Sequence, residues 1–352
     1  MLKSDDLINK VKSYNKFLNP ETLDKAYNFA VKAHENQKRY SGDPYVIHPV
    51  AVANILTELK LDSATIATGL LHDTIEDTHA TYQTIKDEFG QEVADLVEGV
   101  TKISELENQA TANSRAENFR KLIIATSKDI RVLLVKIADR LHNMRTISSI
   151  DKIEKRERIA KETMEIYSPL ADRMGMNRIR DELEDLSFEV LNPNARKLIK
   201  DRLDKIKENN LISFNAVAEE FTKLLQDHGL EARIFGREKT PFSLWRKMQN
   251  KRISLEQITD IMGFRIILDD ISACYKSLGI FHNKWNCIPG KFKDYISTPK
   301  INKYQSLHTA IIGPNQRPIE IQLRTMQMHE FAQRGVASHW KYKSSEKFNS
   351  LT

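Results

Sequence analysis

The stretch LHDTIEDT at residues 71–78 organises the first half of the chain. Residues four apart on a helix share a face, so we expect His72 and Asp73 to lie beside Glu76 and Asp77. Three carboxylates beside one imidazole repel each other, and a divalent cation relieves that repulsion. The apolar residues just before the stretch predict a half-buried helix. We therefore expect a metal site here, and the alternative is a solvated, acidic helix face.

The composition indicates a cytoplasmic enzyme with more than one domain. A chain of 352 residues exceeds one typical domain, and 40% hydrophobic residues support real cores. No apolar run is as long as a membrane span, and the first residues lack the apolar segment of a signal peptide. The two cysteines, Cys274 and Cys287, fit a reducing compartment and are too few for a Cys-rich zinc site.

Charge is distributed unevenly along the chain. Residues 229–352 carry 20 Lys and Arg against 10 Asp and Glu, whereas the rest of the chain carries 34 against 38. The basic part could bind nucleic acid or a polyphosphate ligand, and the acidic part suits a metal. The balance predicts two chemistries in one chain.

Helical patterns fill the chain up to about residue 228, and strand-like patterns appear only after it. Pro20 starts one helix, and the loop at 39–44 separates it from the next, which we expect residues 46–49 (VIHP) to open. The strand-like segments, with helices between them, are 231–236, 264–268, 309–312 and 319–323. The pattern predicts a multidomain fold: an all-helical domain, a helical linker, and an α+β domain on a mixed sheet.

Two more residues complete a ligand set for the metal. His48 stands directly before Pro49, where a helix start can aim its side chain, and Asp139 ends an apolar helical run. With His72 and Asp73 they offer two imidazoles and two carboxylates, which suit Mn²⁺ or Fe²⁺ better than Mg²⁺. A metal of this kind lowers the pKa of bound water. The other histidines nearby, at positions 34, 79 and 142, we expect at the surface or behind the ligands.

The acids one turn beyond the metal ligands have a separate expected role. Glu76 and Asp77 are the best candidates for positioning or deprotonating the attacking water.

A second group of polar residues follows the first strand-like segment. Backbone N–H groups at a helix start favour anions, and four side chains add donors there: Arg237, Lys239, Ser243 and Lys247. A basic, solvated helix is the alternative. Glu320 lies alone between two isoleucines, and a single acid at such a strand position faces a site or a salt bridge.

Other residues of the basic half complete this second site. Asp260, at the start of a strand, could hold Mg²⁺ with Glu320 against phosphates. Tyr304 offers an aromatic face for a base, and further phosphate contacts are available from Lys291, Lys293 and Lys300.

Together these motifs resemble those of the RelA/SpoT homologue (Rel) family of alarmone enzymes. The first part of the resemblance is the His, His-Asp, Asp set typical of HD phosphohydrolases. The second part is six strings: GREKTPFSLWRKM (236–248), DIMGFRI (260–266), KFKDYISTPK (291–300), YQSLHT (304–309), EIQLRT (320–325) and ASHWKYK (337–343). The resemblance implies an HD-type hydrolase at 1–160, a connecting helical region at 161–200 and a nucleotidyltransferase-like synthetase at 201–345.

The resemblance also implies activities and residue roles. It implies Mn²⁺-dependent removal of the 3′-pyrophosphate of (p)ppGpp, and Mg²⁺-dependent transfer of pyrophosphate from ATP to the 3′-hydroxyl of GDP or GTP. The implied Mn²⁺ ligands are His48, His72, Asp73 and Asp139. The implied water-activating pair is Glu76 and Asp77, and the implied nucleotide contacts of the hydrolase are Arg39, Asn143 and Thr146.

For the synthetase, the resemblance implies a set of phosphate, metal and base contacts. The implied ATP-phosphate contacts are Arg237, Lys239 and Lys247, and the implied Mg²⁺ pair is Asp260 and Glu320. Glu320 is also the implied base for the ribose 3′-hydroxyl. Tyr304 resembles the residue that stacks on guanine, and His308 lines that pocket.

Residues 291–294 (KFKD) carry the basic version of a motif that separates bifunctional members from synthetase-only members, so we expect both activities. The chain departs from the family pattern at Tyr40, Thr240, Phe242 and Lys303. These departures leave the metal ligands untouched and bear on the synthetase's rate and on its choice between GDP and GTP.

Three other interpretations stay open. The synthetase domain could be inactive or only regulatory, leaving a hydrolase alone. An RNA-processing module would pair an HD domain with an RNA nucleotidyltransferase, but Ile261 and Met262 follow Asp260, so the expected Asp-x-Asp pair is absent. A nucleotide-sensing scaffold disagrees with the intact metal set.

The expected partners are ATP, GDP or GTP, and (p)ppGpp, without membrane or nucleic acid. From the sequence we expect either a short member of this family or a catalytic fragment. We expect ribosome contact only if a longer form has a C-terminal region.

Overall fold

The computed structural model describes residues 2–16, 18–108, 129–237, 239–255, 258, 263–316 and 318–339. Asp260, and the ASHWKYK motif from residue 340 onward, therefore lie outside the described residues. The chain divides into two compact units. Unit 1 is Met1–Tyr167 with Ala337–Thr352, and unit 2 is Ser168–Val336.

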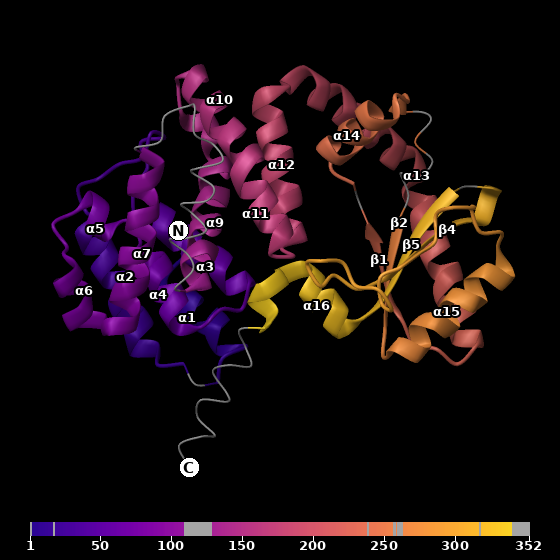
Figure 1. Cartoon of the computed structure of the whole chain (residues 1–352), viewed down its shortest axis with the longest axis horizontal. Coiled ribbons are helices and arrows are strands. Elements are labelled where there is room, and N and C mark those ends of the chain that lie inside the picture. Colours follow the sequence, from indigo (N-terminus) through magenta and orange to yellow (C-terminus); the bar gives the residue numbers. More distant parts are fainter. Residues whose placement is uncertain are drawn as a thin grey trace, which may run out of the picture. The chain divides into compact units, whose positions relative to one another are not determined.

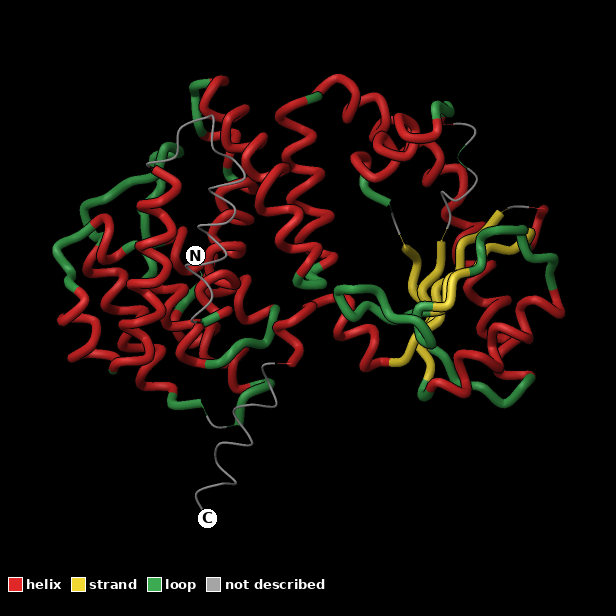
Figure 2. Tube along the Cα trace, in the orientation of Figure 1, coloured by secondary structure: helices red, strands yellow, loops and turns green. Residues whose placement is uncertain are grey.

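Unit 1 is helical throughout its described part (Figures 1 and 2). Its α-helices are α1 (Ser4–Lys12), α2 (Pro20–Ala33), α3 (Ile47–Glu58), α4 (Ser63–Leu71), α5 (Thr74–Asp77), α6 (Tyr82–Phe89), α7 (Gln91–Asn108), α9 (Ile130–Arg145) and α10 (Ile153–Glu162). A short 3-10 helix, η1 (Ile147–Ser149), and a π-helical turn, η2 (Thr163–Tyr167), complete it. The described residues of unit 1 contain no strand, which confirms the prediction of an all-helical first domain.

Capping residues explain where these helices begin. The Asn19 side chain accepts from the backbone N–H of Glu21 at 3.0 Å and starts α2 at Pro20, as predicted. Residues 46–49 open the next helix, as predicted: α3 begins at Ile47 and places His48 within its first turn. An isolated β-bridge between Lys38 and Pro44 closes the loop between the two helices.

Unit 2 combines helices with one sheet. Its α-helices are α11 (Ser168–Arg173), α12 (Asn177–Leu191), α13 (Pro193–Asp227), α14 (Pro241–Lys251), α15 (Ile271–Lys284) and α16 (Met326–Arg334). Its strands are β1 (Arg233–Arg237), β2 (Gly263–Leu268), β3 (Lys293–Asp294), β4 (Leu307–Ile312) and β5 (Pro318–Thr325). The 3-10 segments are η4 (Pro314–Gln316) and η5 (Gly335–His339). The helical-then-α+β order confirms the predicted fold class.

The sheet is mixed, as predicted, with the strand order β1-β2-β5-β4-β3. β2 and β5 run parallel, and the other neighbours run antiparallel. No sequence pattern indicates β3, which has two residues and pairs Lys293 with His308. Short edge strands of this kind carry too few residues to show an alternating pattern.

The two faces of the sheet differ in chemistry, because successive side chains point to opposite sides. On β5, Ile319, Ile321 and Leu323 join the core formed with α13 and α15, which cover that face in Figure 1. The opposite positions of the sheet hold Arg237, Arg265, Lys293, His308, Glu320, Gln322 and Arg324, which we call the polar sheet face.

None of the described helices combines the length and the apolar composition needed to cross a bilayer.

Candidate active sites

The His-Asp pair lies at a junction between two helices, so the expectation of one continuous helix was wrong. α4 ends at Leu71 and α5 begins at Thr74. The Thr74 hydroxyl donates to the Leu71 carbonyl at 2.6 Å, a local bond that competes with the helical ladder. His72 and Asp73 keep right-handed helical backbone angles, although neither residue belongs to α4 or α5. The junction brings His72 Nε2 to 3.1 Å from Asp73 Oδ1.

Four of the predicted ligands meet inside unit 1, and we call them the metal cradle: His48, His72, Asp73 and Asp139. His48 Nε2 lies 3.2 Å from Asp139 Oδ1 and 3.5 Å from Asp73 Oδ2. One ligand atom each of His48, His72 and Asp139 lies within 4.8 Å of the others. The residues come from α3, the α4–α5 junction and α9, which pack against one another.

The two histidines of the cradle are oriented by their outer ring nitrogens. His72 Nδ1 lies 2.9 Å from the Gly69 carbonyl, and His48 Nδ1 lies 2.7 Å from His142 Nδ1. This leaves both Nε2 atoms facing the carboxylates. His72 Nε2 lies near Asp73 Oδ1 but is not aligned for a hydrogen bond with it, so this buried atom has no hydrogen-bond partner among the described residues. Burial lowers the pKa of His48, so its imidazole is neutral near pH 7 and has a lone pair to offer. These features fit a divalent metal.

The carboxylates of the cradle are held ionised by neighbouring donors. Burial opposes ionisation of Asp139, but Lys136 and the cradle histidines outweigh it and hold its pKa well below the usual value. Lys136 is buried, and its Nζ lies 3.0 Å from Asp139 Oδ2 and 3.0 Å from Ser104 Oγ. The sequence analysis did not select Lys136, although a lysine inside an apolar helical run is a usable signal.

Tyr45 is a second residue that the sequence analysis missed. Its hydroxyl lies 2.8 Å from Asp73 Oδ2 and 3.0 Å from Asp77 Oδ2, so it can donate to either carboxylate. Burial, and then these carboxylates, raise the pKa of Tyr45, which therefore keeps its proton. His34 is also buried, and its ring stacks on Tyr45 at 4.8 Å between centroids. His79, in contrast, is exposed.

Glu76 and Asp77 lie on α5 at the exposed side of the cradle. Partial desolvation raises the pKa of Glu76, against the opposing effect of Lys136, and the carboxylates of Asp73 and Asp77 raise it further. A carboxyl whose pKa is raised toward neutrality is better suited to exchange a proton with water. Their role in handling water stays a prediction.

The predicted nucleotide contacts of the first site gather beside Asp139. Arg39 Nη2 donates to Asn143 Oδ1 at 2.9 Å and approaches Thr146 Oγ1 at 3.4 Å. The Asn143 amide in turn donates to Asp139 Oδ1 at 2.6 Å. Tyr40 follows Arg39, is 68% exposed, and accepts from Lys155 Nζ at 2.7 Å.

In unit 2, Glu320 forms salt bridges, as expected for a lone acid in an apolar strand. Arg237 Nη1 lies 3.1 Å from Oε1 and Lys239 Nζ lies 3.1 Å from Oε2. Burial opposes ionisation of Glu320, but Lys239 and Arg237 prevail and lower its pKa. Its predicted partner Asp260 lies outside the described residues, so the Mg²⁺ pair stays a prediction.

The helix that carries Ser243 and Lys247 is α14, and local contacts fix its start. Thr240 caps it by accepting from the Ser243 N–H at 3.3 Å, and the Ser243 hydroxyl donates back to the Thr240 carbonyl at 2.8 Å. Phe242 is buried, with ring centroids 5.5 Å from Phe188 and 5.9 Å from Trp245. Two departures from the family pattern, Thr240 and Phe242, thus have structural roles in this chain.

A cavity of about 290 Å³ joins several residues of the second site. Its lining includes Glu320, His308, Lys293 and Lys291. Asp294 fixes the turn after Lys293, because its Oδ1 accepts from the N–H groups of residues 296 and 297 at 2.9 Å. Lys239, Ser243 and Lys247 do not line this cavity.

Tyr304 lies deeper than a base-stacking role suggests, since only 8% of it is exposed. The Lys300 Nζ lies 5.2 Å from the centre of its ring. The Tyr304 hydroxyl is 2.8 Å from His308 Nε2. The structure therefore brings Tyr304, His308 and Lys300 together.

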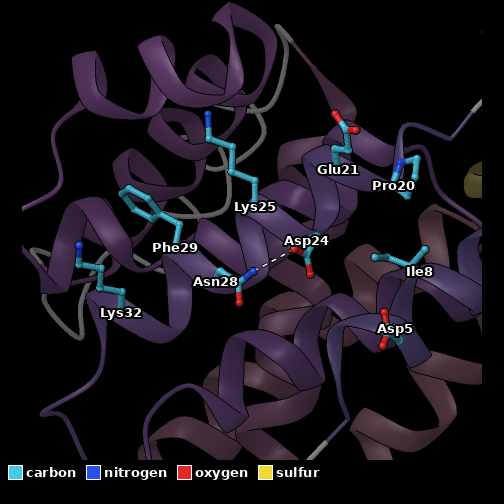
Figure 3. A pocket seen from close by; sticks show the side chains of 9 residues that line it. All are labelled: Asp5, Ile8, Pro20, Glu21, Asp24, Lys25, Asn28, Phe29 and Lys32. Atoms are coloured by element: carbon cyan, nitrogen blue, oxygen red, sulfur yellow. Dashed lines mark hydrogen bonds between the residues drawn. The ribbon is translucent and has the colours of Figure 1, made fainter.

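A separate hollow of unit 1 contains none of the predicted site residues. It lies along α1 and α2 and is lined by side chains of both charges, including Asp24, Lys25 and Lys32 (Figure 3). This mixed and exposed lining offers no set of converging groups for chemistry.

Comparisons with known proteins match both halves of the chain. Residues 26–177 match the family model described as an HD domain, and residues 236–347 match the region found in RelA / SpoT proteins. The chain is 49% identical over 350 residues to the GTP pyrophosphokinase rsh of Brucella melitensis, covering 99% of this chain and 46% of that protein.

Two relatives from Escherichia coli are equally similar. The chain is 49% identical over 321 residues to the bifunctional (p)ppGpp synthase/hydrolase SpoT of strain K12, covering 91% of this chain and 46% of that protein. The same figures hold for the guanosine-3′,5′-bis(diphosphate) 3′-pyrophosphohydrolase of strain O157:H7. The chain thus spans just under half of the length of these relatives.

Proposed function

Because this chain belongs to the RelA/SpoT homologue family, we propose that it is a bifunctional alarmone enzyme. Unit 1 hydrolyses the 3′-pyrophosphate of (p)ppGpp, and unit 2 transfers pyrophosphate from ATP to the 3′-hydroxyl of GDP or GTP. The observation that carries the proposal is the convergence of His48, His72 and Asp139 within 4.8 Å beside Asp73. A cytoplasmic location stays a prediction.

The cradle would hold Mn²⁺ in the hydrolase. When bound, the metal supplies Lewis acidity, which activates a water and polarises a phosphoryl oxygen. Glu76 accepts a proton from the attacking water, because its raised pKa suits that exchange. The water oxygen bonds to the phosphorus next to the ribose 3′-oxygen, that P–O bond breaks, and the 3′-oxygen takes up a proton. Arg39, Asn143 and Thr146 hold the nucleotide.

In the synthetase, the chain's contribution is positioning and charge neutralisation. The ribose 3′-oxygen attacks the β-phosphorus of ATP, AMP leaves, and Glu320 accepts the hydroxyl proton. Arg237 and Lys239, which pair with Glu320 in the structure, would turn to the phosphates when ATP binds. Asp260 and Glu320 would hold Mg²⁺.

The test of the hydrolase is ppGpp breakdown by the purified chain with Mn²⁺ and after its chelation. We expect pyrophosphate release that stops on chelation. His72→Ala should abolish it, whereas the matched control His79→Ala, at an exposed histidine, should not. Equal activity in the two variants would contradict the assignment.

The test of the synthetase is ppGpp formation from ATP and GDP with Mg²⁺. Glu320→Gln should abolish it, and Asp269→Asn, at an exposed acid of the same unit, should not. Hydrolysis without any synthesis by the wild-type chain would leave the hydrolase-only interpretation.

A further inference from the structure

The start of α14 is already occupied by a carboxylate of the protein, that of Asp185 on α12. The Asp185 side chain is only 13% exposed, and its Oδ1 accepts from the backbone N–H of Phe242 at 3.1 Å. A carboxylate is favoured at this place, because it meets both an N–H group without a partner inside the helix and the positive end of the helix dipole. The proposed mechanism does not use Asp185.

The other N–H groups at the start of α14 are also used within the protein. Pro241, the first residue of the helix, has no N–H group. The Ser243 N–H donates to the capping Thr240 Oγ1 at 3.3 Å. With the Phe242 N–H bound by Asp185, none of the three residues that begin this described helix has an N–H group left for a phosphate. The anion that the helix start favours is therefore part of the protein.

Asp185 also joins α14 to a third helix. Its Oδ2 accepts from Arg196 of α13, at 3.0 Å from Nε and 2.7 Å from Nη2. The same guanidinium contacts Glu189 of α12, with Nη1 2.9 Å from Oε1. Each oxygen of Asp185 thus has its own partner, which fixes the carboxylate in one orientation.

Two further contacts fasten α14 to α12. Arg246 Nη1 lies 3.1 Å from Oε1 of Glu184, which is buried. The Phe188 ring packs against Phe242 and Trp245, with centroids 5.5 Å and 5.1 Å apart. The α14 residues in these contacts are three and four apart, so they lie on one face of the helix. Together with the carboxylate at the helix start, they hold α14 in one rotation about its axis.

The predicted contacts of the second site on α14 depend on how this helix is held. Ser243 and Lys247 are four residues apart, so they share a face that differs from the one packed on α12. Because the N–H groups of the helix start are used within the protein, binding of a triphosphate here would rely on side chains. A displacement of about 1 Å is enough to weaken such contacts strongly.

We propose that Asp185 is a positioning residue for ATP: its carboxylate occupies the anion-binding start of α14 and fixes this helix, so that side chains rather than backbone N–H groups hold the triphosphate. This proposal rests on the proposed synthetase function of unit 2. It predicts that loss of the carboxylate weakens ATP binding. If the triphosphate instead bound the helix start directly, removal of this competing negative charge would strengthen ATP binding.

The experiment compares Asp185→Ala and Asp185→Asn with the wild-type chain and with Glu189→Ala. This control removes a carboxylate from the same helix and from the same arginine but leaves the start of α14 intact. Calorimetry with ATP and Mg²⁺, without an acceptor nucleotide, gives the Kd for ATP. Synthesis assays give the KM for ATP and for GDP, and thermal unfolding gives Tm.

Loss of a hydrogen bond to a charged group should raise the Kd and the KM of Asp185→Ala for ATP about tenfold, with a smaller change in the KM for GDP. Asp185→Asn keeps an acceptor for the Phe242 N–H, so its Kd should lie between those of the wild-type chain and the alanine variant. The Kd of Glu189→Ala for ATP should equal that of the wild-type chain.

A purely structural role predicts a lower Tm of Asp185→Ala with an unchanged Kd for ATP, and that result would overturn the proposal. A lower Kd would overturn it as well, because it would show that the helix start itself takes the phosphate. If Asp185→Ala does not fold, hydrogen exchange of the Phe242 amide in the wild-type chain, followed by NMR, decides. Protection already present without ATP supports the proposal, and protection that appears only with ATP overturns it.

The proposed activity can fail separately from this role. If the wild-type chain binds ATP but makes no ppGpp, the synthetase function is wrong, and a raised Kd in Asp185→Ala still supports the positioning role.

Discussion

The metal cradle of unit 1 and the polar sheet face of unit 2 both bury charged side chains, but they balance them differently. In the cradle, the carboxylates of Asp73 and Asp139 are met by two histidines and by Lys136. On the sheet face, neither Arg265 nor Arg324 forms a salt bridge among the described residues, and Glu320 is met by two cations. One region has donor atoms ready for a cation, and the other has an excess of positive charge ready for a polyanion.

Removing a buried cation should therefore have opposite consequences in the two units. Where the cation balances acids, its removal leaves an uncompensated negative charge. Where it forms no ion pair, its removal relieves the free-energy cost of burying an unpaired charge.

Lys136→Met is therefore expected to produce the largest change in stability. Removing one partner of a buried ion pair typically costs about 3–5 kcal/mol, so the free energy of unfolding should fall by about that amount. Denaturant unfolding, followed by circular dichroism, measures it, with Lys86→Met as the control at an exposed lysine. Mn²⁺ should restore part of the loss, because it supplies the missing positive charge. Equal stability of Lys136→Met and Arg324→Met would break the comparison between the units.

His142→Ala should have the next largest effect, on metal affinity. His142 orients His48 through the 2.7 Å contact between their Nδ1 atoms, and removing such supports typically weakens metal binding about 10–100-fold. Titration calorimetry with Mn²⁺ at one pH measures the change, with His79→Ala as the control. An unchanged affinity would mean that the cradle does not depend on this contact.

Asp129→Asn should have the smallest effect and should depend on pH. Asp129 accepts from Arg131, which also contacts Asp62 and Glu92, so this cation of unit 1 is balanced by acids as well. Burial opposes its ionisation, but Arg131 lowers the pKa of Asp129 below its usual value. The stabilisation is therefore present above the unfolded pKa, near 4, and is lost as pH falls through the folded pKa.

The stability deficit of Asp129→Asn should be no more than about 1 kcal/mol at pH 7, because the pair is partly solvated. It should shrink as the pH is lowered toward 3, as measured by denaturant unfolding at both pH values. A deficit that is the same at both pH values would place its origin in packing.

Much of the fold could be predicted from periodicity. The long strands β2, β4 and β5 and the helices around them carry clear patterns, and caps such as Asn19 mark the helix starts. β3 could not be found, because two residues show no period. The α4–α5 junction escaped prediction because His72 and Asp73 keep right-handed helical backbone angles and neither is a helix-breaking residue.

The candidate-site residues that belong to sequence motifs were predicted. Those whose positions depend on tertiary packing were missed. The cradle residues lie together, but their placement does not test the roles assigned to them. Tyr45 owes its position beside Asp73 to a contact across the fold, and the Arg324 guanidinium contacts His329 on the following helix. No local pattern shows that a strand arginine lacks an acidic partner. Such residues become visible only when the chain is folded.

Whether the two chemistries belong to separate groups of residues is decided by assaying Asp73→Ala for both hydrolysis and synthesis. We expect this variant to lose Mn²⁺-dependent pyrophosphate release from ppGpp and to keep ppGpp formation from ATP and GDP, with Glu320→Ala showing the reverse. Unchanged hydrolysis in Asp73→Ala, or loss of both activities in a folded Asp73→Ala protein, would contradict it.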